Sequence, residues 1–63
     1  MDRYRLTLAI GARTIMRGWW PDLPTAERKY LRWIGERSSV NGTRVTLVDE
    51  AADGRALESW PPD

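Results

Sequence analysis

The sequence predicts an α+β fold of the order ββαββ, in which two hairpins form a four-stranded antiparallel sheet and one helix packs across one face. Three observations predict it. Residues 3–10 alternate apolar with other side chains, residues 24–37 carry an apolar stripe at helical spacing, and residues 43–49 have high β-propensity. At 63 residues, the chain is expected to form a single domain, 1–63.

The first hairpin is expected to join strands 3–10 and 13–20 around Gly11-Ala12. Two registers are open. A two-residue type II′ loop pairs Ile10 with Arg13 and mixes arginines into the apolar face, whereas a three-residue loop pairs Ile10 with Thr14. Because a slip of one residue turns every side chain to the other face, the apolar pattern favours the second register. That register places Met16 opposite Leu8, Gly18 opposite Leu6 and Trp20 opposite Tyr4, and its reverse face holds Arg3, Arg5, Arg13, Ile15, Arg17 and Trp19.

The helix is expected over residues 24–37, after Pro21 and Pro24 have ended the second strand. Asp22 and Thr25 are the candidate N-caps. The apolar stripe that would lie on the sheet consists of Leu23, Ala26, Tyr30, Trp33 and Ile34. The opposite side of the helix then carries Arg28, Lys29 and Arg32.

The second hairpin is expected to join strands 43–49 and 55–60, after a turn at Asn41-Gly42. Pairing Asp49 with Arg55 aligns Leu47 with Leu57, and it also predicts a surface ion pair between Asp49 and Arg55. This register places three apolar side chains on one face: Val45, Leu47 and Leu57.

The composition argues against an enzyme, because the chain contains no His and no Cys. Histidine is the usual proton-transfer side chain near neutral pH, and these two residue types supply most transition-metal ligands. The single lysine, Lys29, lies between arginines with no sign of an activated nucleophile. The carboxylates of Asp49, Glu50 and Asp53 match no calcium-loop spacing. We therefore expect no catalytic residue, no metal site and no cofactor.

The net charge of +1 conceals an asymmetry along the chain. Residues 1–40 have a balance of +4 and residues 41–63 a balance of −3, so the two halves could attract each other in a dimer, or the basic half could face an anionic partner. A domain of this length without disulfide or metal also has a thin stability margin. We therefore expect a homodimer, formed by extending the sheet edge to edge or by packing helix against helix.

The location and origin follow from composition alone. Residues 1–5 lack the apolar segment of a signal peptide, and no apolar run approaches the ~20 residues that cross a bilayer. A cytoplasmic protein without membrane contact is expected. Nine of the ten basic residues are arginine, which indicates a GC-rich coding sequence, as in a high-GC bacterium or its phage.

The leading functional hypothesis is a non-enzymatic protein–protein interaction module that acts on an unidentified protein partner and on itself. Adjacent indoles on a strand lie on opposite faces, so Trp19 and Trp20 cannot share one core, and exposed tryptophan is favoured in interfaces. The expected contact residues are Arg13, Arg17, Trp19 and Trp20. The alternative is a nucleic-acid-binding accessory protein that uses the first hairpin through Arg3, Arg5, Arg13, Arg17 and Trp19.

Overall fold

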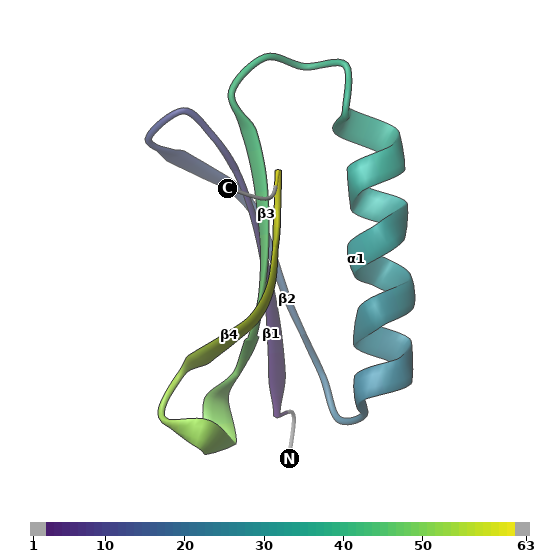
Figure 1. The fold of residues 1–63 in the computed structure, drawn as a ribbon, viewed down its shortest axis with the longest axis vertical. Coiled ribbons are helices and arrows are strands. Elements are labelled where there is room, and N and C mark those ends of the chain that lie inside the picture. The colour runs from purple at the N-terminus through teal and green to yellow at the C-terminus, as the bar shows by residue number, and fades with distance from the viewer. Residues whose placement is uncertain (1–2, 62–63) are drawn as a thin grey trace.

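The predicted ββαββ arrangement is confirmed in a computed structural model, which describes residues 3–61 (Figure 1). Four strands form one sheet in the order β2-β1-β3-β4, with antiparallel neighbours throughout. The helix α1 lies along one face of this sheet, and η1 with the β3–β4 turn curves toward the opposite side at one end of the strands (Figure 1). The elements are β1 (Tyr4–Ile10), β2 (Arg13–Trp20), α1 (Leu23–Arg37), β3 (Thr43–Asp49), the 3₁₀ turn η1 (Glu50–Ala52) and β4 (Arg55–Trp60).

The helix connects an edge strand to a central strand. Strands β2 and β3 each pair with β1 in the antiparallel sense, so they run parallel to each other with β1 between them. A connection between parallel strands cannot be a tight turn and must cross over the sheet. This crossover places α1 over the central strands and leaves β2 and β4 as the two edges.

The first hairpin combines features of both predicted registers. Met16 pairs with Leu8 and Trp20 with Tyr4, as the favoured register requires, but Ile10 pairs with Arg13 and not with Thr14. The three-residue loop is therefore wrong. Gly11 has φ +62°, which suits the first central position of a type II′ turn. A β-bulge reconciles this short turn with the apolar face, because it leaves Ile15 without a partner and restores the register beyond it.

The second hairpin also contains a bulge. Asp49 pairs with Arg55 in the sheet as predicted, but Leu47 pairs with Glu58, because Leu57 has no partner in β3. The predicted alignment of Leu47 with Leu57 is wrong for this reason. Val45 and Leu47 are fully buried, whereas Leu57 is exposed.

The core lies between the sheet and the helix. Its buried side chains come from β1, β3 and α1, and Trp20 of β2 packs at its border with its ring edge-on to that of Trp33, 6.0 Å between centroids. Asp22 is the N-cap of α1, since its carboxylate accepts a hydrogen bond from the Thr25 amide at 2.9 Å. The core cluster is Leu6, Leu8, Ala26, Tyr30, Trp33, Val45 and Leu47.

The helix α1 is 15 residues long and carries charged side chains along its outer surface. Within residues 3–61, no helix is long and apolar enough to cross a membrane.

Candidate functional site

The candidate site is the face of the sheet opposite α1, called the open face below. Successive side chains in a strand point to opposite faces of the sheet. Because Leu6 and Leu47 are buried on the helix side, the residues before and after them point to the open face, and strand pairing aligns these residues in two rows across its centre. Trp19, Arg5, Val48 and Ala56 form one row, and Arg17, Thr7, Thr46 and Ser59 form the next.

Three exposed apolar side chains lie on the open face. Trp19 is 46% exposed, Ile15 is 42% exposed and Leu57 is 39% exposed. Ile15 and Leu57 are the unpaired bulge residues of the two edge strands, and each precedes a residue whose side chain faces the helix. An antiparallel sheet can leave a polar face to water. This face is not wholly polar, since it exposes these three apolar side chains.

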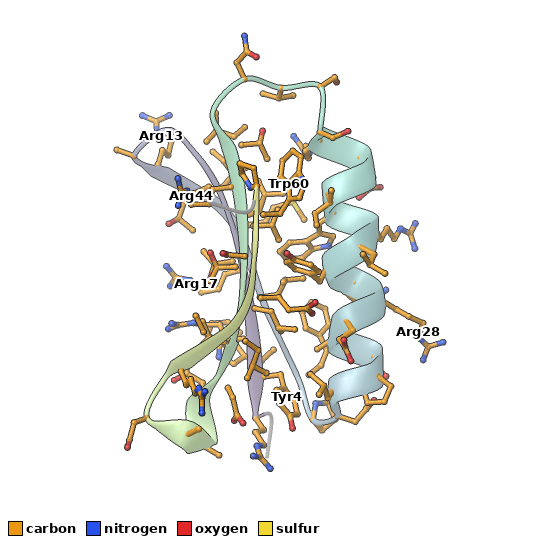
Figure 2. All side chains as sticks on the ribbon, viewed as in Figure 1. Tyr4, Arg13, Arg17, Arg28, Arg44 and Trp60 are labelled. Atoms are coloured by element: carbon orange, nitrogen blue, oxygen red, sulfur yellow. The ribbon has the colours of Figure 1, made fainter. Side chains whose placement is uncertain are left out.

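Arginines occupy the same surface. Arg17 and Arg44 extend from the side of the sheet that faces away from the helix, and Arg13 lies at the tip of the β1–β2 hairpin, where it pairs with Ile10 (Figure 2). None of the three forms an ion pair with another residue of the described part of the chain. Their guanidinium groups are therefore available for an anionic or aromatic partner.

Arg5 lies on the open face but is already paired. Its Nη1 atom lies 3.0 Å from Oε1 of Glu50, and its Nε atom is buried without a hydrogen-bond partner among residues 3–61. This pair brings the Glu50 carboxylate to the open face at the end of β3, next to the β3–β4 turn.

Arg3 does not join the basic surface. Its Nε and Nη2 atoms each donate to the Asp49 carboxylate at 2.9 Å, and its guanidinium carbon lies 5.3 Å from the centre of the Tyr4 ring. The Arg3 hydrogen bonds hold the pKa of Asp49 below its usual range, with help from the Ala51 amide. The predicted ion pair between Asp49 and Arg55 is wrong, because Arg3 occupies that carboxylate.

The charge on the open face is polarised along the strands. The end near the β1–β2 turn carries Arg44, which forms no ion pair within residues 3–61, and the end near the β3–β4 turn carries the ion pair of Glu50 with Arg5. Arg44 and Glu50 lie six residues apart along β3 and its extension, a separation of about 20 Å at the rise of a β-strand. The two charges are therefore too far apart to neutralise each other within one molecule.

The structure brings together some of the sequence-predicted contact residues and separates others. Arg17 and Trp19 share the open face, whereas Trp20 packs against the core on the other side of the sheet. The sequence predicts Arg13 on the open face, but it pairs with Ile10 of the helix-side face at the tip of the first hairpin. Sequence reasoning missed Arg44, although its alternation with Val45 in a predicted strand could have found it. It also missed Leu57, whose exposure depends on a bulge.

The outer surface of the helix offers a second basic cluster. Thr25, Arg28, Lys29 and Arg32 line a shallow hollow there, and Arg28 points away from the sheet (Figure 2). The Nε atom of Arg32 also lies 3.9 Å from Oε2 of Glu36, one helical turn further on. No group of three metal-ligating side chains occurs within residues 3–61.

Comparison with known proteins adds no relative. No protein-family model matches the chain, and no curated protein or solved structure matches it.

Proposed function

We propose that this chain is a small non-enzymatic protein–protein interaction module, that it self-associates, and that the open face is its contact surface. The observation that carries the proposal is the exposure of Ile15, Trp19 and Leu57 on the sheet face that the helix leaves uncovered. These side chains form the apolar part of the surface, and Arg17 and Arg44 on the same face supply directional contacts.

Trp19 is the expected centre of the contact. A tryptophan buries about 150–250 Å² with little loss of side-chain entropy, and tryptophan and arginine are the residue types most enriched at interface hot spots. Arg17 pairs with Thr7 one row from Trp19 and lies on the same strand. The combination suits a partner surface that has an apolar centre and an acidic border.

A nucleic-acid-binding role is the second candidate, and the three unpaired arginines favour it. Arg13, Arg17 and Arg44 could contact phosphates while Trp19 stacks on an unpaired base. Two observations weigh against it. Arg3 and Arg5 are held by carboxylates, and the whole chain carries a net charge of only +1.

The test is the solution mass at several protein concentrations, with and without a mixed pool of short DNA and RNA at low salt. We expect a mass that rises with concentration and does not respond to nucleic acid. Trp19→Ala should reduce the rise, whereas the matched variant Leu31→Ala, which removes a 66% exposed side chain from the helix, should not.

Two results would contradict the proposal. If Trp19→Ala self-associates as the wild type does, the open face is not the contact surface. A complex with nucleic acid that weakens steeply with salt and with Arg17→Ala would support the second candidate instead.

A further inference from the structure

We propose that the partner of the open face is a second copy of this chain, packed face to face about a twofold axis that lies between the two sheets and runs across their strands. This inference rests on the proposed function and adds the occupant, the orientation and the contacts. Sheets packed in this way lie about 10 Å apart, within reach of two facing arginine or glutamate side chains.

The first argument is the polarity of charge along β3. Arg44 has no ion pair within residues 3–61, and Glu50, the first residue of η1, follows the opposite end of the same strand with its carboxylate held on the open face by Arg5. A twofold axis across the strands exchanges the two ends of the sheet. It therefore brings Arg44 of each protomer to the partner subunit's Glu50, and the contact occurs twice.

The second argument is that the same axis position also brings complementary side chains of β2 together. The midpoint between Arg44 and Glu50 on β3 is Leu47, which pairs with Leu6 on β1. Leu6 also pairs with Gly18, which lies midway between Arg17 and Trp19 on β2. An axis above this one row thus places Arg17 over the partner subunit's Trp19, where a guanidinium and an indole face attract each other.

The charge pattern and the sheet edges disfavour two other twofold arrangements. An axis along the strands would bring the basic end of one open face onto the basic end of the other. An axis perpendicular to the sheet would join two edges, but both edge strands contain a bulge, at Ile15 in β2 and at Leu57 in β4. Bulges interrupt the row of backbone donors and acceptors that edge pairing needs.

The size of the open face sets the expected affinity. Four strands about 4.8 Å apart and seven residues at about 3.3 Å each give a face of about 440 Å² per copy. Two copies bury about 900 Å², which is less than the 1,200–2,000 Å² or so of stable interfaces and typical of transient ones. We therefore expect a dimer that dissociates in the micromolar range or above.

The experiment exchanges the charges of the proposed contact in two separate variants, Arg44→Glu and Glu50→Arg. Each variant alone would place like charges together at both copies of the contact, and we expect its dimer to be roughly 30-fold weaker. In an equal mixture, Glu at position 44 of one variant faces Arg at position 50 of the other, and the unchanged pair remains. Mixing should therefore restore a dimer to within about threefold of the wild-type affinity, a heterodimer visible by native mass spectrometry.

The control is Arg28→Glu, which makes the same charge change on the outer surface of the helix (Figure 2). It should dimerise as the wild type does. Far-ultraviolet circular dichroism of each variant verifies that the fold is retained, and Arg44→Glu suffices alone because it removes no ion pair within residues 3–61.

The outcomes separate this inference from the proposed function. A mixture that stays monomeric, or an Arg44→Glu variant that dimerises normally, overturns the face-to-face arrangement. If Trp19→Ala still weakens the wild-type dimer in that case, the open face remains the contact surface in another orientation. A wild-type chain that stays monomeric at millimolar concentration overturns both the arrangement and the self-association.

Discussion

Gly18 tests the packing of the core most directly. It lies on the helix side of β2, beneath the ring of Trp20. A Cβ atom at this position would lie 2.5 Å from Cη2 and 2.8 Å from Cζ3 of that ring, whereas carbon atoms in contact prefer about 3.5–4.0 Å. In Gly18→Ala the indole must therefore move by about 1 Å. Trp33 limits this movement, because its ring packs edge-on against that of Trp20, with 6.0 Å between the ring centroids.

The expected magnitude is a loss of about 1–2 kcal/mol in the free energy of unfolding. Overpacking of a core costs about 1–3 kcal/mol, and replacing a strand glycine by alanine returns about 0.5–1 kcal/mol of backbone entropy. With an unfolding entropy of about 2.1 cal/mol/K for each of the 63 residues, the melting temperature should fall by about 8–15 °C.

Gly35→Ala is the matched control, since it adds the same methyl group to the helix at a position where no atom beyond the neighbouring residues and the helix's own backbone lies within 4 Å. Helix propensity then raises stability by about 0.5–1 kcal/mol and the melting temperature by about 4–8 °C. Urea unfolding followed by tryptophan fluorescence measures both variants. The reasoning is refuted if Gly18→Ala is as stable as the wild type while its near-ultraviolet circular dichroism is unchanged, since the indole would then not have moved.

Two further predictions concern pH. Arg3 lowers the pKa of Asp49 in the folded state. On acidification the Asp49 carboxylate is therefore protonated first in the unfolded chain. The stabilisation that the ionised carboxylate contributes is present above about pH 4 and is lost as pH falls through the pKa of the folded state. Asp49→Asn should therefore lose less stability than the wild type between pH 7 and pH 2 in urea titrations. Burial, with a smaller effect of Glu58, raises the pKa of Tyr30 in the folded state. The Tyr30 hydroxyl therefore ionises first in the unfolded chain, and the folded state loses stability as pH rises above about 10. Tyr30→Phe should show a smaller alkaline loss in the same assay, and an equal loss would contradict this assignment.

The fold could be predicted because its elements are encoded by local patterns. The alternation of Leu6 and Leu8 and the helical spacing of Ala26, Tyr30 and Trp33 each specify one buried face. These faces fit together in one way, with the helix over the sheet. The apolar pattern also predicted the pairing of most of the first hairpin.

The two bulges could not be predicted, because they result from competition between local and tertiary preferences. Gly11 favours a two-residue turn, which by itself would turn the rest of β2 to the wrong face. The buried face of β1 requires the opposite register, and leaving Ile15 unpaired satisfies both requirements. Asp49 presents a similar case, since its partner Arg3 lies 46 residues away in the sequence and no local pattern indicates their contact.

The same bulges connect the stability of the domain to its proposed binding surface. Without its bulge, every residue of β2 would pair with β1. The outer side of β2 would then present an unbroken row of backbone donors and acceptors, which could pair with the edge strand of another molecule. The bulges in β2 and β4 interrupt both edges and place Ile15 and Leu57 on the open face. Association through the edges is thereby disfavoured, while apolar area is added to the face. The two bulges, which sequence patterns do not predict, therefore favour association through the open face over association through the edge strands.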